Sequence, residues 1–154
     1  MEKKGIKIVA ENRKARFNYS FEDRFEAGLV LKGTEVKSLR EGRAHLKDAY
    51  AKIQNGELFV HQMHISPYPF AYYDNHDPER PRKLLMHKHE IRRLTGKIVE
   101  RGYALIPLNI YFKNGKVKIT LGLGKGKQRH DKRETIRRRD QQRDMDRARK
   151  ENYQ

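Results

Sequence analysis

The side chains best able to do chemistry in this chain are cations, which gather in segments 12–16, 80–93 and 125–150. An arginine guanidinium offers a planar fork of donors that matches phosphate and base edges, and a lysine neutralises phosphate as a point charge. Flat rings that could stack on unpaired bases accompany the first two segments. They are Phe17, Tyr19, Phe21, His87 and His89. These residues favour binding to folded RNA with exposed loops, although one or two of the rings at 17–21 fit a core or strand-face position better.

The overall charge supports a polyanionic partner. The chain has 154 residues, with 36 lysines and arginines against 20 acids, and a formal net charge of +16. RNA, DNA or an anionic membrane could accept such a surface. No apolar run reaches the roughly 18 residues of a membrane span, and the apolar stretch 6–9 is too short for a secretory signal. We therefore expect a cytoplasmic protein without membrane contact.

The sequence carries no familiar catalytic or metal-binding pattern. Without cysteine there are no disulfides, thiolates or common structural zinc sites. His61 and His64 form an HxxH pair, but residues three apart on a strand point to opposite faces. No cluster of acids could hold two metal ions, and neither a nucleophile elbow nor a Walker loop occurs. We expect no metal, no cofactor and no enzymatic activity.

Two hairpins are the clearest structural prediction. Segments 103–112 and 116–121 alternate apolar and polar residues, and segments 49–53 and 58–65 repeat the pattern. Each pair is joined by a turn that contains Asn-Gly, which is the strongest short-range hairpin signal. The sequence therefore predicts at least four strands from these segments alone.

A third extended stretch and two helices complete the expected elements. Residues 17–31 should form one or two strands that twist or bulge near 26–28. Thr34 can cap a short helix that Gly42 ends. A longer helix is expected at 88–100, where isoleucines and a leucine recur at helical spacing.

These elements predict a mainly β fold. A proline-rich loop at 66–83 separates the second hairpin from the longer helix. Five to seven short strands with helices between them fit a small closed Greek-key barrel of the OB type, with two or three short helices. An SH3-like barrel is the nearest alternative.

The last thirty residues form a basic tail, in which twelve cations and six acids leave a net charge of +6. Glycines at 122, 124 and 126 precede the tail and suggest a flexible hinge. From residue 132 onward there is no glycine or proline, and opposite charges recur at helical spacing. The tail has almost no apolar stripe, so it cannot gain much by packing on the body.

The expected domain organisation follows from this division. Residues 1–123 should form the barrel, and residues 124–154 should form a tail that is disordered when free and helical on RNA. If the tail is considered by itself, the alternative is that it is a run of solvated charges without a binding partner.

Several longer motifs resemble those of the SmpB family of SsrA-binding proteins, in the same order and over essentially the whole chain. The sequence GTEVKSLR, followed far downstream by a glycine-lysine run and DKR, is the most specific of them. The matching stretches are residues 11–15, 25–28, 32–40, 82–85 and 126–133.

This resemblance implies a bacterial protein whose OB-type barrel binds the tRNA-like domain of transfer-messenger RNA (tmRNA, or SsrA RNA). It also implies that the protein, together with elongation factor Tu, brings alanyl-tmRNA to ribosomes stalled without a usable codon. The tail would then enter the vacant mRNA channel and contact the RNA of the small ribosomal subunit.

The candidate site residues combine the resemblance with the cation and ring pattern. The resemblance implies tmRNA contacts at Asn12, Glu26, Leu85, Lys125 and Lys127, and in the signature helix at Gly33, Glu35, Lys37 and Ser38. The pattern of cations and rings adds Arg13, Lys14, Arg16, Phe17, Lys83, His87 and Lys88. In the tail, the expected ribosome contacts are His130, Asp131, Lys132, Arg133, Arg137 and Arg138. The resemblance implies that His130 stacks on a base of the decoding centre.

Some points stay open at this stage. Glu26 would repel phosphate, so it could accept a hydrogen bond from a base amine, hold a neighbouring arginine, or be a buried acid at a strand bulge. Some family members carry histidine at the position of Phe17, and some carry an apolar pair where this chain has Lys150 and Glu151. A ribosomal protein that binds ribosomal RNA through a basic extension is an alternative function, and an RNA-processing enzyme is a third.

Overall fold

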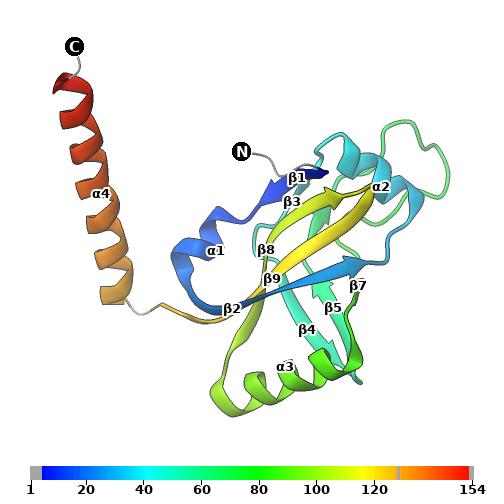
Figure 1. Ribbon diagram of the computed structural model, residues 1–154. Coiled ribbons are helices and arrows are strands. Elements are labelled where there is room, and N and C mark those ends of the chain that lie inside the picture. Colours follow the sequence, from blue (N-terminus) through cyan, green and yellow to red (C-terminus); the bar gives the residue numbers. More distant parts are fainter. Residues whose placement is uncertain (1–4, 128, 153–154) are drawn as a thin grey trace.

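The computed structural model describes residues 5–127 and 129–152, without the side chains of 129–131 and 152, and within these ranges it has nine strands and four helices (Figure 1). The elements are β1 (Ile6–Glu11), α1 (Arg13–Asn18), β2 (Tyr19–Leu29), α2 (Gly33–Arg40), β3 (Ala44–His45), β4 (Tyr50–Gln54), β5 (Glu57–His61), β6 (His64–Ile65), β7 (Arg82–Leu85), α3 (Lys88–Arg101), β8 (Ala104–Lys113), β9 (Lys116–Gly126) and α4 (Arg129–Asn152). The prediction of a mainly β chain is confirmed.

The strands form a large antiparallel sheet in the order β1-β8-β4-β5-β7-β2-β9. Because β8 also pairs with β9, six of these strands join edge to edge in a closed ring, which we call the barrel. Strand β1 pairs with β8 on the edge that also meets β4. The ring is weakest between β4 and β8, which pair only at Ala51 and Leu105. Strands β3 and β6 form a separate short pair beside it.

Both predicted hairpins are confirmed, but the strand predicted at 58–65 ends at His61, and residues 64–65 form a separate strand that pairs with β3. Asn114 and Gly115 connect β8 to β9 with φ of 51° and 79°, and Asn55 and Gly56 connect β4 to β5 with φ of 51° and 75°. Two successive residues with positive φ match the twist of an antiparallel pair, and asparagine followed by glycine tolerates this backbone best.

The core lies inside the ring and beneath α3. Leu58, Leu84 and Ile119 come from three different strands and are 0–1% exposed. Helix α3 contributes Ile91 and Leu94, and its end is set by the left-handed backbone at residue 102. The helix predicted at 88–100 is therefore confirmed to within one residue.

The sequence suggested that the glycines before the tail form a flexible hinge, but the structure shows that this prediction is wrong. Gly122 and Gly124 lie within β9 and are buried. A Cβ atom on Gly122 would stand 2.6 Å from Cδ1 of Phe21, and one on Gly124 would overlap the carbonyl oxygen of Ser20. These glycines allow β2 to lie close beside β9 at the register shift of β2, and β9 continues to Gly126.

The stretch predicted as extended at 17–31 begins in a helix instead. Helix α1 includes Phe17, and β2 starts only at Tyr19. The irregular register of β2 falls between Phe21 and Asp23, where Tyr19 and Phe21 pack against a second apolar cluster, and not at 26–28.

The start of the signature helix also differs from the prediction. Helix α2 begins at Gly33, one residue before the predicted cap. The Oγ1 atom of Thr34 instead lies 2.9 Å from Nδ1 of His76, in the loop that covers the helix. A long-range contact has therefore replaced the local capping bond that the sequence suggested.

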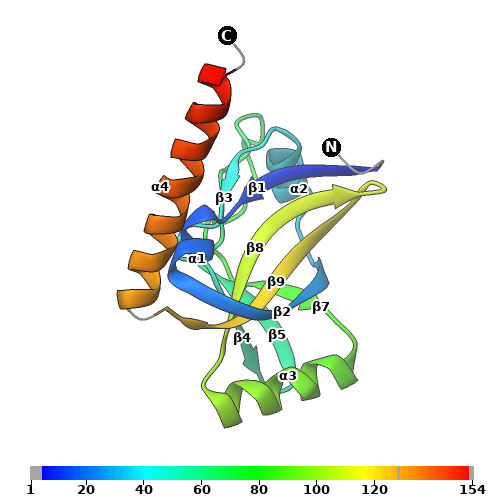
Figure 2. The same ribbon diagram turned by 60° about the vertical axis from the view of Figure 1, so that its left-hand side comes forward.

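Helix α4 is the one element that extends away from the barrel (Figures 1 and 2). It carries charged residues all round, and from Arg133 onward its described side chains are exposed, except for the half-buried Thr135. Packing on the barrel therefore contributes little to this helix.

Candidate nucleic-acid interface

Asn12 holds helix α1 in place from a buried position. Its amide nitrogen donates to the carbonyl oxygens of Leu46 at 3.2 Å and Pro107 at 3.0 Å. Its Oδ1 accepts from the backbone nitrogen of Ala15 at 3.1 Å, which caps the helix. With 7% exposure and all its side-chain groups in use, Asn12 orients α1, and the exposed cations on α1 face solvent.

These cations are Arg13, Lys14 and Arg16, and the fold brings the end of β9 beside them. Ser20 pairs with Lys125, and the backbone nitrogen of Lys127 donates to the carbonyl oxygen of Asn18 at 2.8 Å. The first and last predicted cation segments are more than a hundred residues apart in sequence, yet they form one positive surface.

Phe17 connects this surface to the tail helix. The Lys132 ammonium lies 5.9 Å from the centre of the Phe17 ring, and the Arg139 guanidinium lies 5.7 Å from it. Nζ of Lys127 donates to Oγ1 of Thr135 at 3.0 Å, which adds a hydrogen bond between β9 and α4. Cation–π contacts hold the first turns of α4 beside α1, as the ribbon in Figure 2 shows. The Phe17 ring is therefore already in contact with two cations of the tail.

Glu26 lies on the outer face of the barrel, where three strands meet. Its carboxylate accepts a short hydrogen bond from the Tyr111 hydroxyl and lies 3.4 Å from Nζ of Lys113. The bond from Tyr111, with Lys113 and Lys118 nearby, holds the pKa of Glu26 below its usual value. Burial, together with the bond to Glu26, raises the pKa of Tyr111 to about 12.

These contacts remove two of the open alternatives for Glu26, the neighbouring arginine and the buried acid at a bulge. It is exposed, it holds a tyrosine and a lysine in place of an arginine, and it is not at the bulge of β2. Its charge is partly offset, so the repulsion of a phosphate at this face is reduced.

Leu85 stands near Glu26 on the same face and is 53% exposed. It pairs with Gly28, where an added Cβ would touch its side chain at 3.4 Å. The missing side chain at Gly28 therefore leaves Leu85 open to a partner.

Glu35 is fully buried and holds two arginines together. Its carboxylate accepts from Nε of Arg82 at 2.5 Å, from Arg80, and from the backbone nitrogen of Lys32 at 2.8 Å. Burial alone would raise the pKa of Glu35, but these hydrogen bonds hold it below its usual value. Arg82, also 0% exposed, donates further to the carbonyl oxygens of Met63 and Pro78.

The signature helix therefore divides into structural and accessible positions. Glu35 and Ser38 were expected to contact RNA, but both are 0% exposed, and Oγ of Ser38 donates to the carbonyl oxygen of Ser66 at 2.7 Å. Their role in this structure is to anchor the loop at 66–81 to α2. Gly33 and Lys37 are exposed, with the Lys37 ammonium 5.4 Å from the centre of the Tyr68 ring.

The remaining body residues of the predicted site are exposed around the start of α3. Lys83 lies 3.3 Å from a carboxylate oxygen of Glu57. His87 stacks on His89 with ring centres 5.6 Å apart, and Lys88 begins the helix. This group is separate from the surface formed by α1 and the end of β9.

Neither a metal cluster nor a membrane-spanning helix is found among the described residues. No three histidines, aspartates or glutamates come together there in a way that could hold an ion. His61 stacks on Tyr50, whereas His64 stacks on His45, so the HxxH pair is divided between two neighbours. Within the same residues, no helix is long and apolar enough to cross a bilayer.

Comparison with known proteins gives the family. The family model described as "SmpB protein" matches residues 9–151. The chain belongs to the SmpB family. The SsrA-binding proteins of Syntrophobacter fumaroxidans and Geobacter sulfurreducens are 57% and 56% identical to it, over 96% of this chain and 92% and 96% of theirs.

A solved structure supports the same assignment. It is described as "tmRNA-SmpB: a journey to the center of the bacterial ribosome", and one of its chains is 48% identical to this one. The alignment covers 83% of this chain and 94% of that chain, with a TM-score of 0.66. The resemblance read from GTEVKSLR and the downstream DKR is therefore confirmed.

Within this SmpB-family fold, the accessible residues predicted for the body fall into three surfaces, apart from Gly33 and Lys37, which are exposed on α2. Asn12, Glu35 and Ser38 are buried. The surfaces are α1 with the end of β9, the outer barrel face around Glu26 and Leu85, and the start of α3. Arg133, Arg137 and Arg138 are exposed on α4. The side chains of His130 and Asp131 lie outside the described part of the chain.

Sequence reasoning missed the partners of the two candidate acids. Tyr111 and Lys113 contact Glu26, and Arg82 joins Arg80 on Glu35. Tyr111 looked like an ordinary alternating strand residue, and Arg82 looked like one cation in a basic run. The available signal for Tyr111 was a phenolic hydroxyl in a predicted strand, because such a hydroxyl usually finds a hydrogen-bond partner when the ring is buried.

Proposed function

We propose that this protein binds the tRNA-like domain of tmRNA and delivers alanyl-tmRNA, with elongation factor Tu, to ribosomes stalled on mRNA without a stop codon. It would do so in the cytoplasm as an RNA-binding factor without catalysis of its own. The observation that carries the proposal is the SmpB-family match over residues 9–151, which includes both the barrel and most of the tail.

The proposed barrel is of the OB type, and its outer face and α1 would contact the tRNA-like domain. Ring closure among six strands and the exposed Leu85 beside a partly neutralised Glu26 support this assignment. Lys125 and Lys127, next to the cations of α1, would hold phosphates.

The proposed role of the tail is to occupy the empty mRNA channel. Exposed Arg133, Arg137 and Arg138 would meet the phosphates of small-subunit RNA, and His130 would stack on a base of the decoding centre. To enter the mRNA channel, the tail must leave Phe17, whose ring contacts Lys132 and Arg139 in this structure. Its departure would free the Phe17 ring to stack on RNA. We propose that the released tail is disordered until it refolds on the ribosome.

The test is a truncation that removes residues 131–154. Binding to the isolated tRNA-like domain should survive, because the barrel, α1, Lys125 and Lys127 remain. In a separate assay with stalled ribosomes, the truncated protein should no longer support peptide tagging. If the truncation abolished binding to the tRNA-like domain as well, the division between barrel and tail would be wrong.

A single substitution tests the decoding-centre role. His130→Ala should impair accommodation of tmRNA on the ribosome while the affinity for free tmRNA stays near that of the unaltered protein. A matched change at the outer end of the tail, Arg149→Ala, should affect accommodation less. Equal losses in both steps for His130→Ala would contradict the assignment.

A further inference from the structure

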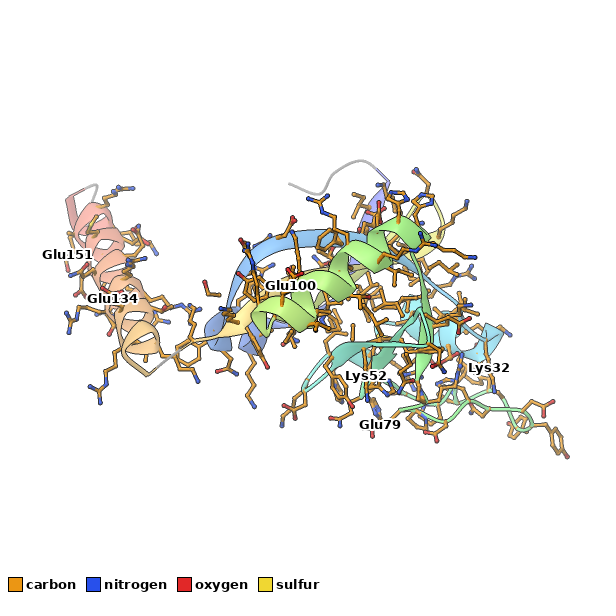
Figure 3. The ribbon with its side chains drawn as sticks, turned by 90° about the horizontal axis from the view of Figure 1, so that it is seen from below. Lys32, Lys52, Glu79, Glu100, Glu134 and Glu151 are labelled. Carbon is orange, nitrogen blue, oxygen red and sulfur yellow. The ribbon has the colours of Figure 1, made fainter. Side chains whose placement is uncertain are left out.

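A groove with a volume of about 710 Å³ opens between α1, β4, α3 and the start of β8. Figure 3 looks at this end of the molecule, with α3 in front and Lys52 and Glu100 labelled. The volume lies within the range of about 300 to 1,000 Å³ found for small-molecule sites. Neither Glu26 nor Leu85 lines the groove.

Weak strand pairing explains why the groove exists. Strands β4 and β8 pair only at Ala51 and Leu105, so the sheet opens on either side of this contact. Helix α3 packs Ile91 and Leu94 into the core and leaves Val99 at the edge of the opening, 77% exposed. The walls are otherwise largely aliphatic.

Three tyrosine rings line the groove, and each has a neighbour that fixes its orientation. Tyr50 stacks on His61 with ring centres 5.2 Å apart, and Tyr19 stacks on Phe21 at 5.9 Å. The Lys125 ammonium lies 5.0 Å from the centre of the Tyr103 ring. Rigid aromatic faces at the edge of an apolar cavity suit a flat ligand ring.

The charges around the groove are mainly positive. Lys14 and Lys52 line it, and Lys125 stands over Tyr103. Among the described lining residues Asp48 is the one acid, and it lies 3.8 Å from Nζ of Lys14. An occupant with flat apolar faces and a negative charge would match both the walls and the rim.

The chain's own tail does not fit this description. Helix α4 has Ile136 and Met145 as its larger apolar residues, and they are surrounded by arginines that the rim lysines would repel. An unpaired nucleotide does fit, because it carries a flat base and a phosphate on one unit.

We propose that this groove binds an unpaired nucleotide of RNA, with the base stacked on Tyr50 and the phosphate near Lys14 and Lys52. The proposal rests on the proposed RNA-binding function and adds to it a second contact surface, separate from the outer barrel face. The nucleotide could come from tmRNA or from ribosomal RNA.

The experiment uses the full-length protein and a short oligoadenylate as the probe. Amide chemical shifts followed by NMR during the titration should change around Tyr50, Val99 and Tyr103. Tyr50→Ala should weaken oligoadenylate binding about tenfold, and Tyr50→Phe should retain it, because stacking needs only the ring. Tyr72→Ala, at an 88% exposed position on the loop at 66–81, is the matched control.

A second variant avoids any effect on folding. Val99→Glu changes an exposed side chain and places a carboxylate at the mouth of the groove, so it should repel the phosphate. Tyr73→Glu, at another 88% exposed position, adds the same charge outside the groove lining and should leave binding unchanged. Shift changes confined to the outer barrel face or α4, or equal binding by both groove variants and the controls, would overturn the proposal.

The two possible sources of the nucleotide give different results with larger probes. If the groove variants weaken binding to the tRNA-like domain of tmRNA, the nucleotide belongs to tmRNA. If they weaken only binding to purified small ribosomal subunits, it belongs to ribosomal RNA; an effect on neither overturns the proposal. If the unaltered protein self-associates and Val99→Glu makes it monomeric, the groove is a protein interface. That result would also overturn the proposal.

Failure of the proposed function can be told apart from failure of the groove. If the unaltered protein does not bind the tRNA-like domain, the proposed function is wrong, and the oligoadenylate titration still decides whether the groove binds a nucleotide.

Discussion

Glu35, Arg80 and Arg82 in the barrel share a buried network of hydrogen bonds, whereas Arg133, Arg137 and Arg138 on α4 are exposed to solvent. Both regions are rich in arginine, but the barrel uses these charges to close the loop at 66–81 onto α2. The tail keeps its charges available to a partner. Removing a charge should therefore cost stability in the barrel and binding in the tail.

The largest expected effect comes from breaking the buried network. Arg82→Ala leaves the Glu35 carboxylate buried with one partner fewer, which should lower the free energy of unfolding by about 3–5 kcal/mol. Urea denaturation would measure the loss. Arg138→Ala in the exposed tail is the matched control and should change stability by less than about 0.5 kcal/mol. Similar losses for both would remove the distinction between the two regions.

The same network should make the stability of the barrel decrease at acid pH. Because the pKa of Glu35 is lowered from 4.5, its contribution to stability is present above that pH and is lost as the pH falls through the folded-state pKa. Glu35→Gln should weaken this dependence in unfolding curves recorded below pH 5. A variant as acid-sensitive as the unaltered protein would show that other carboxylates dominate.

A smaller effect is expected where lysines of the barrel meet the tail. Replacing Lys125 and Lys127 with alanine should weaken RNA binding and flatten its salt dependence, since each lost phosphate contact contributes about 0.7–0.9 to the log–log slope. Affinities measured over a range of salt concentrations would test this. Lys47→Ala, at an exposed position outside the proposed surfaces, is the control. An unchanged slope would place the two lysines away from phosphate.

The Tyr111–Glu26 pair should show an effect of about 1 kcal/mol. Tyr111→Phe removes the hydrogen bond and should bring the pKa of Glu26 closer to its usual value, as carboxyl NMR would show. In the unaltered protein the pKa of Tyr111 is about 12, so its stabilisation is present below about pH 10 and is lost as the pH rises through 12. Tyr72→Phe should leave the Glu26 titration unaffected.

The smallest effect concerns the contact that links the two regions. A double-mutant cycle of Phe17→Ala and Arg139→Ala should give a coupling energy of about 0.5–1 kcal/mol, which is typical of an exposed cation–π pair. Amide hydrogen exchange in α4 would report it. Pairing Phe17→Ala with Arg137→Ala should give no coupling. Equal coupling in both cycles would mean that the tail does not dock through Arg139.

The features predicted correctly are those with local causes. The turns at Asn55-Gly56 and Asn114-Gly115 depend on two residues and their flanking alternation, and α3 depends on apolar spacing within one segment. Helix α1 was missed because it is only six residues long, and its cap, Asn12, is held by carbonyls of Leu46 and Pro107. Such distant partners leave no local pattern.

The candidate site was predictable as a set of residue types and less so as a set of roles. Cations at 12–16 and at 125–127 were identified, but only the pairing of β2 with β9 shows that they adjoin. Glu35 and Ser38 were identified with the signature helix, and only the covering loop shows that they are buried. A sequence motif does not show which face of its helix is covered by other parts of the chain.

By itself, the sequence determined the sign and distribution of charge, the hairpins, and the family, because these depend on composition and on short patterns of neighbouring residues. Only the tertiary structure decided which charges are neutralised inside the barrel, which ring the tail helix contacts, and where a groove opens beside α3. The physical reason is that these features require contacts between strands and helices that are far apart in the chain. A charge that such contacts bury must be paired inside the protein and affects stability, whereas a charge that stays exposed is available for binding.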